Sequence, residues 1–596
     1  MQQGLRRAGH FSSIGQATPT LTRKHPWLQG LTAGLIGLAA AGSLACGYEI
    51  FPEGRNVLAA VQSWLPEAVL GGVGLGAFAW AALRSEGKSR PDDPVALAIE
   101  QLRWSRNDFC RGWYISGATG SGKTEALKLL MHQLCRSESD WGGLFIDEKS
   151  FFADEVLPIL ETYSRSNDVR ELRTRPEKAA PDWKPPFCFN ILGDEQVRTS
   201  QYVEAILMVA EAVASGKEDK GFFKTQAGLH IGAAIDLFRG LREWQQQVGV
   251  PREAWVAPTL RGIYEILTNE EDFQRLVKDR VGLFVEQVPS NEAERENDAS
   301  GKTVLIPDFR GVAPTLLLQA IDHFGKRYWN VRAQEQMEGV KGTITNYLRW
   351  FTDDAIHQVF GAEAANFTMS CMDEGKMIFV SLPQRYAIER RYICALLKVL
   401  AYAHARSRTP TKKNYNLMVI WQDEAQRFIM PIDGDVDILR QFHVTTVIST
   451  QFRAQLEKAL GGKENAQPII GNLRNRIILQ AADEECAEES AKYIGKGLRR
   501  KRSYTRQGDG QRSSSYSDEI AYFIEPYQLR QLPKFVAVFC HAAGRHRVLQ
   551  FTPLDAQGRI PKWFRGLALP GLRFKLWGQS IGPKFSPFTP PKLHIR

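Results

Sequence analysis

The octapeptide GATGSGKT constrains this chain more than any other feature, because it fits the pattern G-x-x-x-x-G-K-[ST] at every fixed position. Residues 113–115 before it have the composition of a buried strand, and Glu125 to Arg136 after it has the periodicity of an amphipathic helix. In a loop between strand and helix, backbone N–H groups cradle nucleotide phosphates. The predicted phosphate-binding residues are Gly117, Ala118, Thr119, Gly120, Ser121, Gly122, Lys123 and Thr124. Lys123 would reach the β- and γ-phosphates, and the Thr124 hydroxyl would ligate Mg²⁺.

A second motif far downstream supplies the carboxylates that such a site needs. The apolar run 416–421 ends in Gln422, Asp423 and Glu424, which is the Walker B pattern of a buried strand with acids at its end. Asp423 is the expected Mg²⁺ residue, and Glu424 is expected to polarise the attacking water. The next predicted strand, Thr445 to Thr450, ends at Gln451, which is placed to sense the γ-phosphate or is an ordinary polar residue at a strand end.

The distance between the two motifs indicates an insertion. Thr124 and Asp423 are 299 residues apart, whereas a compact domain has about 100–150 residues. Apolar residues recur at helical spacing in Tyr202 to Ala214, Gln226 to Arg239 and Leu316 to Gln334. The sequence therefore predicts an α/β RecA-like P-loop core interrupted by an inserted all-α domain.

Two apolar stretches near the N-terminus predict a membrane anchor. Trp27 to Tyr48 contains no charged residue, and its 22 residues match a hydrocarbon core of about 30 Å. A second stretch runs from Ala68 to Leu83, and cations flank the pair on both outer sides. By the positive-inside rule both termini face the cytoplasm. A cleaved signal peptide is the alternative interpretation of the first stretch, but the stretch starts late and is long for one.

The net charge of +10 is carried mainly by the two ends of the chain. Residues 1–26 contribute +4 and residues 553–596 contribute +7, which leaves the rest close to neutral. Within that rest, Leu498 to Arg512 has six cations and few apolar residues, so we expect a mobile loop. Such a loop could follow a phosphate backbone, with Tyr504 available for stacking, or it could be a solvated insertion. The aromatic and basic tail from Pro553 does not resemble a folded core.

Taken together, these motifs resemble the coupling proteins of type IV secretion and conjugation systems, the TraD/TraG/TrwB-like ATPases. The resemblance includes the two-span anchor, the P-loop, Asp147 and Lys149 after the first helix, and Asp423-Glu424. It continues through segments 189–192, 449–451, 472–477 and 525–533. Ser150 departs from the glycine that many members have after the lysine.

The resemblance implies a homo-oligomer, a hexameric ring in the bacterial inner membrane, that hydrolyses ATP with Mg²⁺. It also implies that the ring receives a relaxosome and passes single-stranded DNA with its relaxase to the type IV secretion channel. A ring motor needs a cation from the neighbouring subunit in the transition state, and Arg474 and Arg476 are the candidates for this arginine finger. Two alternatives remain: a coupling ATPase that delivers protein effectors, and an FtsK/HerA-like translocase on double-stranded DNA.

The expected domain organisation follows from these assignments. It comprises a cytoplasmic N-terminal segment 1–26, a transmembrane hairpin 27–83, a P-loop part 84–195, an all-α insertion 196–345, a Walker B part 346–552 and a basic aromatic tail 553–596.

Overall fold

The computed structural model describes residues 93, 95–99, 102–148, 152–180, 182–213, 221–276, 294–297, 303–306, 314–329, 333–409, 415–506, 512–562, 574–576 and 579–581. The chain divides into two compact units, residues 1–105 and residues 106–596. In the first unit, β1 (Val95–Ile99) and β2 (Leu102–Ser105) form an antiparallel pair. Within the described part of the chain, no helix has the length and apolarity needed to cross a bilayer. The predicted spans, Trp27 to Tyr48 and Ala68 to Leu83, lie outside the described residues.

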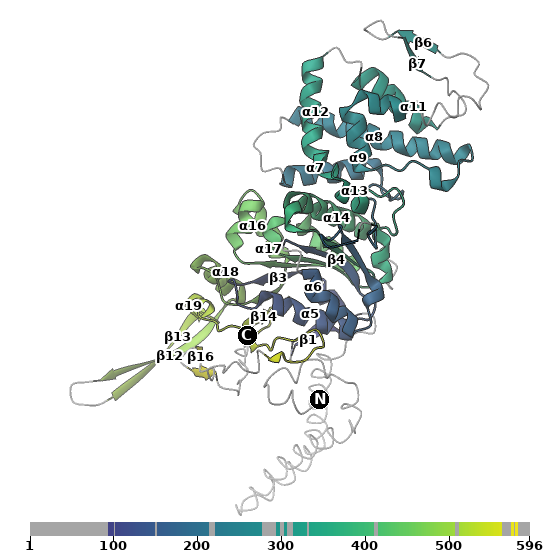
Figure 1. Ribbon diagram of the computed structural model, residues 1–596. Coiled ribbons are helices and arrows are strands. Elements are labelled where there is room, and N and C mark those ends of the chain that lie inside the picture. The colour runs from purple at the N-terminus through teal and green to yellow at the C-terminus, as the bar shows by residue number, and fades with distance from the viewer. Residues whose placement is uncertain are drawn as a thin grey trace, which may run out of the picture. The chain divides into compact units, whose positions relative to one another are not determined.

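The second unit is built on a nine-stranded sheet, of which Figure 1 labels β3, β4 and β14. The order of its strands is β15-β14-β11-β3-β10-β9-β4-β8-β5. The seven strands from β11 to β5 are parallel, and β14 and β15 add an antiparallel edge. In chain order the strands are β3 (Trp113–Ser116), β4 (Gly142–Asp147), β5 (Val169–Arg173), β8 (Met377–Ser381), β9 (Met418–Asp423), β10 (Val444–Thr450), β11 (Asn475–Ile478), β14 (Val536–Cys540) and β15 (His546–Gln550). Strands β4, β8, β9 and β10 are buried along their whole length, as expected of parallel strands covered on both faces.

Helices connect these strands, and a connection between parallel neighbours has to cross over the sheet. They are α5 (Lys123–Ser137), α6 (Phe152–Thr162), α14 (Ala387–Ser407), α16 (Arg453–Ala459), α17 (Lys463–Asn472), α18 (Glu484–Ile494) and α19 (Pro526–Arg530). Helix α14 is the most buried of them, because it packs on the strands on one side and on the helical insertion on the other.

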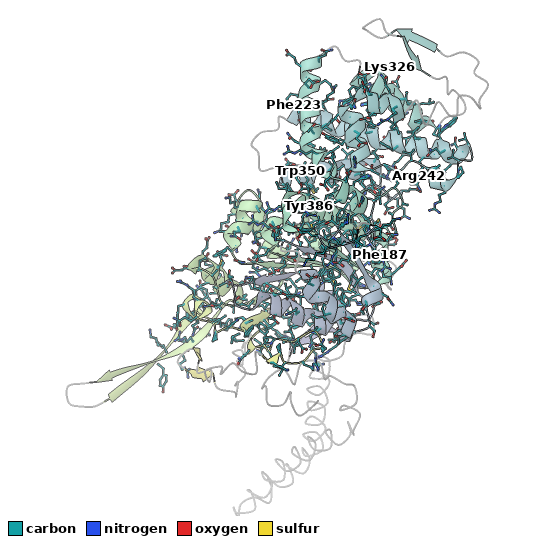
Figure 2. All side chains as sticks on the ribbon, viewed as in Figure 1. Phe187, Phe223, Arg242, Lys326, Trp350 and Tyr386 are labelled. Atoms are coloured by element: carbon teal, nitrogen blue, oxygen red, sulfur yellow. The ribbon has the colours of Figure 1, made fainter. Side chains whose placement is uncertain are left out.

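The insertion between β5 and β8 is mainly helical, as the sequence predicts. It contains α7 (Thr199–Val213), α8 (Gly221–Gln247), α9 (Leu260–Thr268), α11 (Thr315–His323), α12 (Gln334–Leu348) and α13 (Asp354–Phe360). Figure 2 shows the side chains of this part, including Phe223 and Trp350. Gly339 of α12 faces the Phe223 ring of α8 so closely that a Cβ there would come within 2.6 Å of the ring. The Trp350 ring stacks on Tyr392 of α14 with 5.5 Å between centroids, which ties the insertion to the core.

The insertion departs from the all-α prediction in two places. The charged segment around 291–302 contributes β6 (Glu294–Asn297), which pairs with β7 (Thr303–Ile306). The single helix predicted from Leu316 to Gln334 is also wrong. Helix α11 ends at His323 and passes into a π-helical turn, Phe324–Tyr328, before α12 starts at Gln334.

One further expectation needs correction near the C-terminal end. The basic segment predicted as a mobile loop from Leu498 to Arg512 forms a long antiparallel ribbon instead, β12 (Lys496–Arg506) with β13 (Arg512–Tyr522). The ribbon is held by backbone pairing along eleven residue pairs, and a search for apolar periodicity does not detect such a pairing. The tail, which does not resemble a folded core in sequence, contains a short strand pair, β16 (Phe574–Leu576) and β17 (Gln579–Ile581).

Candidate nucleotide-binding site

Three parallel strands bring the predicted site residues to one edge of the sheet. Strand β3 ends at Ser116 and leads into the P-loop, β9 ends at Asp423, and β10 ends at Thr450. Strand β10 lies between the other two, with Thr450 beside Ser116 and Ile448 beside Gln422. Motifs 299 residues apart in sequence therefore become neighbours, because the carboxyl ends of parallel strands share an edge.

The P-loop has a compact local structure. Helix α5 starts at Lys123, directly after Gly122, whose φ of 111° is open to glycine and strained for other residues. Gly117 is equally constrained by space, since a Cβ there would lie 2.8 Å from Leu479. The Lys123 ammonium donates to the carbonyl oxygens of Gly117 and Ala118 at 2.8 and 3.2 Å. The loop therefore folds around the lysine that the motif assigns to the phosphates.

A chain of side-chain hydrogen bonds joins the P-loop to the Walker B end. The Thr119 hydroxyl donates to Gln451 Oε1 at 2.9 Å, and Gln451 Nε2 donates to Glu424 Oε1 at 2.8 Å. The other Glu424 oxygen, Oε2, accepts from Gln426 Nε2 at 2.6 Å. Thr450 completes the chain by donating to Gln426 Oε1 at 3.0 Å. Gln451, which the sequence placed as a sensor or as an ordinary polar residue, is the bridge between the two halves.

Glu424 has an unusual backbone conformation. Its φ of 52° and ψ of 46° place it in the left-handed region, which residues other than glycine and asparagine rarely adopt. Such conformations persist where surrounding contacts over-determine them, often at functional sites. Here the two glutamine amides hold the carboxylate, and Glu424 itself is 7% exposed.

Two acidic side chains lie at the ends of neighbouring strands beside the P-loop. Asp147 at the end of β4 lies in register with Asp423 at the end of β9, and both are buried. The Thr124 hydroxyl and the Asp423 carboxylate line the same cavity, which is a donor set of the hard oxygens that Mg²⁺ prefers. Lys149, the second residue of the motif after β4, lies outside the described residues. On the first turn of α5, burial raises the pKa of the Glu125 carboxyl, although Lys128 donates to it at 2.7 Å.

The cavity at this edge has a volume of about 230 Å³. Its lining residues are Thr119, Gly120, Gly122, Lys123, Thr124, Glu125, Asp423, Glu424, Gln451, Lys534 and Phe535. Three of these, Glu125, Lys534 and Phe535, were not predicted as site residues. Phe535 has φ of 64°, its N–H donates to Ser121 O at 3.3 Å, and its ring packs against Gly122. This fixes the exposed Lys534 at the mouth of the cavity. No motif signals such a contact, since it comes from the loop before β14.

The two arginine candidates have different environments. Arg476 in β11 is 7% exposed, and its guanidinium lies 3.4 Å from the centre of the Tyr493 ring while Nη2 donates to Ile470 O at 3.1 Å. Burial lowers the pKa of Arg476. A finger must project from its own subunit, so this internal packing argues against Arg476. Arg474 is exposed and lies at the start of β11, at the sheet edge opposite the P-loop of its own chain. Its role stays a prediction.

Comparisons with known proteins agree with this architecture. The family model described as the TraM recognition site of TraD and TraG matches residues 417–534. No curated protein matches the sequence significantly.

Among solved structures, the bacterial conjugative coupling protein TrwB in its trigonal form with sulphate is similar, with a TM-score of 0.51 and 13% identity, over 81% of this chain and 93% of that chain. The unbound monoclinic form of TrwB has a TM-score of 0.50 and 13% identity, over 81% of this chain and 93% of that chain. TrwB with the ATP analogue ADPNP has a TM-score of 0.50 and 13% identity, over 81% of this chain and 94% of that chain. At this identity the likeness shows a shared fold, a RecA-like core with a helical domain. The match to the TraD/TraG model and the TrwB fold confirm the resemblance that the motifs indicate, to the TraD/TraG/TrwB-like family of coupling proteins.

Proposed function

We propose that this chain is a coupling ATPase of a type IV secretion system, with the cavity at the ends of β3, β10 and β9 as its hydrolytic site. The observation that carries the proposal is the bridge through Gln451, which hydrogen bonds to the P-loop residue Thr119 and to Glu424. A phosphate seated on the loop and a water near Glu424 would both lie next to this amide. Gln451 can therefore link occupancy of the γ-phosphate position to the orientation of the carboxylate.

Each predicted residue has a role that its surroundings support. Lys123, now bonded to loop carbonyls, would exchange these partners for phosphate oxygens. Glu424, held by two glutamine amides, would orient and polarise the attacking water. Thr124 and Asp423 would hold Mg²⁺, which supplies charge neutralisation on the phosphates. ATP is the proposed nucleotide, and the TrwB structures with ADPNP and with the GTP analogue GDPNP support a triphosphate ligand.

The finer parts of the proposal follow the family resemblance. We propose a hexameric ring in the inner membrane, anchored by the hairpin 27–83, with Arg474 completing the site of the next subunit. Its partners would be a relaxosome with its relaxase, single-stranded DNA and the secretion channel. The domain limits proposed from the sequence, 84–195, 196–345 and 346–552 with the tail 553–596, belong to this proposal.

Two other functions use the same core. A coupling ATPase for protein effectors would have the same nucleotide site and differ in what it recognises. An FtsK/HerA-like translocase on double-stranded DNA would also hydrolyse ATP, but the helical insertion from α7 to α13 favours the coupling proteins, because the TrwB fold carries a helical domain too.

The test is ATP turnover by the full chain in detergent micelles, with and without single-stranded DNA. Lys123→Ala and Glu424→Gln are expected to lower turnover at least about 100-fold, whereas Lys458→Ala, an exposed cation on α16 outside the cavity, should leave it unchanged. Turnover in Lys123→Ala equal to the wild type would refute the assignment of the site.

Two further readouts separate the finer claims. Specific activity that rises with protein concentration, and that is lost in Arg474→Ala while nucleotide binding remains, supports a site completed between subunits. Stimulation by single-stranded DNA supports DNA transfer, whereas turnover indifferent to DNA favours delivery of protein effectors.

A further inference from the structure

The ribbon β12–β13 is a long element that the nucleotide site does not use. Eleven consecutive residue pairs join its strands, from Lys496 opposite Tyr522 to Arg506 opposite Arg512, without a bulge. At about 3.4 Å per residue the paired part is roughly 35 Å long. Figure 1 shows the ribbon extending away from the nine-stranded sheet.

The two faces of the ribbon differ in composition. Side chains alternate between faces along a strand, and the register pairs even-numbered positions only with each other. We call the even-numbered face the cationic face, and its positions are Lys496, Leu498, Arg500, Arg502, Tyr504, Arg506, Arg512, Ser514, Tyr516, Asp518, Ile520 and Tyr522. It has five cations, three tyrosines and one acid. The opposite face has two cations, Arg499 and Lys501, one acid, Glu519, and otherwise small residues.

At the base of the ribbon the opposite face is partly covered by the core and the cationic face is more exposed, although Lys501 of the opposite face is also 60% exposed. On the opposite face, Gly497 lies against the Phe523 ring, where a Cβ would come within 2.6 Å, and Arg499 reaches Glu525 at 3.7 Å. On the cationic face, Leu498, Tyr516 and Ile520 are 64%, 58% and 73% exposed. Leu498 and Ile520 are direct register partners, so the exposed apolar side chains form a cross-strand pair.

Cations and rings alternate on this exposed face. The Lys496 ammonium lies 4.5 Å from the centre of the Tyr522 ring, and the Arg500 guanidinium lies 5.9 Å from that of Tyr516. Arg500 also contacts Asp518 at 3.4 Å, but both side chains are more than half exposed, and such pairs contribute little and are easily exchanged. Over residues 496–522 seven cations stand against three acids, a net charge of +4.

We propose that the cationic face of β12–β13 binds single-stranded nucleic acid. A backbone of phosphates would follow the cations, and bases would stack on the tyrosines, which is how sequence-tolerant single-strand binding works. Charge complementarity favours a polyanion over a neutral protein partner. A lipid surface fits less well, because the segment 505–515 between Tyr504 and Tyr516 contains no large apolar residue that could enter a bilayer. The inference goes beyond the nucleotide site, and it rests on the proposed function only for the identity of the strand as cargo.

The test compares two double variants that remove the same charge from opposite faces. Binding of a fluorescein-labelled oligo(dT) 30-mer to the full chain in detergent is followed by anisotropy between about 50 and 200 mM salt. Arg502→Gln/Arg506→Gln on the cationic face should weaken binding at least about tenfold and reduce the slope of log Kd against log salt by about 1.4, since each phosphate contact contributes roughly 0.7. Arg499→Gln/Lys501→Gln on the opposite face should stay within about threefold of the wild type.

A third variant separates stacking from charge. Tyr516→Ser should weaken binding at least about fivefold with an unchanged salt slope, because stacking releases no counterions.

Equal loss from both double variants would mean that net charge alone binds the strand and would overturn the assignment to one face. Unchanged binding in all variants would place the strand elsewhere. If the wild type binds no oligo(dT) but the cationic-face variant loses binding to vesicles with 30% phosphatidylserine, the face is a lipid contact and the proposal fails. ATP turnover without DNA, which depends on Lys123 and not on the ribbon, tests the proposed function independently of these results.

Discussion

Replacing Lys398 tests whether a buried ion pair behind the Walker B strand stabilises the core. Lys398 on α14 and Asp433 after β9 have no exposed surface. The ammonium donates to Asp433 Oδ2 at 2.6 Å, Phe428 O at 2.5 Å and Gln422 Oε1 at 3.1 Å, so all its protons are used. Burial lowers the pKa of Lys398, whereas Asp433 opposes that shift. The pair thus joins a helix, the strand that ends in Asp423, and the loop beyond it.

Lys398→Met keeps an unbranched side chain, one atom shorter, and removes its charge. The Asp433 carboxylate would keep three neutral donors, the Tyr402 hydroxyl, the Gln422 amide and the Met430 N–H, but no cation. Loss of one member of a buried pair costs about 3–5 kcal/mol, because the other charge stays buried without compensation. Since a domain has only about 5–15 kcal/mol of stability, the variant should unfold at clearly lower urea concentration.

The assay is urea unfolding of the full chain in detergent, followed by tryptophan fluorescence, to which the buried Trp421 contributes. The control is Lys376→Met. Lys376 contacts Asp168 at 2.8 Å, but both side chains are more than a fifth exposed, and its loss should cost at most about 1 kcal/mol. Lys398→Met/Asp433→Asn should recover part of the loss, since no uncompensated charge remains. A cost for Lys398→Met no larger than for Lys376→Met would refute the reasoning.

Three further predictions follow from the contacts described. Lys534→Ala should raise the Kd for ATP several-fold in equilibrium binding, because an exposed cation fixed at the mouth of the cavity is removed; an unchanged Kd would show that Lys534 does not reach the nucleotide. Burial lowers the pKa of His132 to about 4, so the folded state loses stability as the pH falls below the usual histidine pKa of 6.5. The loss is roughly 2 kcal/mol between pH 7 and pH 5. His132→Gln should therefore flatten the decline of the unfolding midpoint over that pH range. Gly143→Ala should disrupt the pairing of β4 with β9 and prevent recovery of folded protein, because its Cβ would come within 1.9 Å of Val419 O. The control Gly342→Ala, which has open space around it on α12, should be neutral or stabilise the protein by about 1 kcal/mol. Normal thermal unfolding of Gly143→Ala would contradict this.

The sequence predicted the parts of the fold that depend on local patterns. The P-loop, the buried strands β9 and β10 and the helix α5 have strong periodicity and sharp ends, and the structure has them where expected. Asp423 and Gln451 were placed beside the P-loop because parallel strands share an edge, which needs no knowledge of the strand order.

What the sequence could not predict depends on packing across the chain. The burial of Arg476 follows from Tyr493 on α18, which folds over β11 and encloses the guanidinium. The same is true of Lys534, whose place at the cavity is set by Phe535 and its contact with Gly122. The β12–β13 ribbon was interpreted as a loop because strands exposed on both faces carry no apolar alternation.

The strand order explains why Gln451 can act on both halves of the site. If β9 were next to β3, the Walker B carboxylates would approach the P-loop directly and leave no room for an intervening residue. Because β10 lies between them, strand spacing of about 4.8 Å separates each pair of neighbours, and a side chain at the end of β10 is within reach of both. The amide of Gln451 has an acceptor and a donor at its two ends, and these match the Thr119 hydroxyl and the Glu424 carboxylate. A glutamate in its place could not donate to Glu424, so the amide chemistry, and not only the position, makes this residue a link between phosphate binding and the water-activating carboxylate.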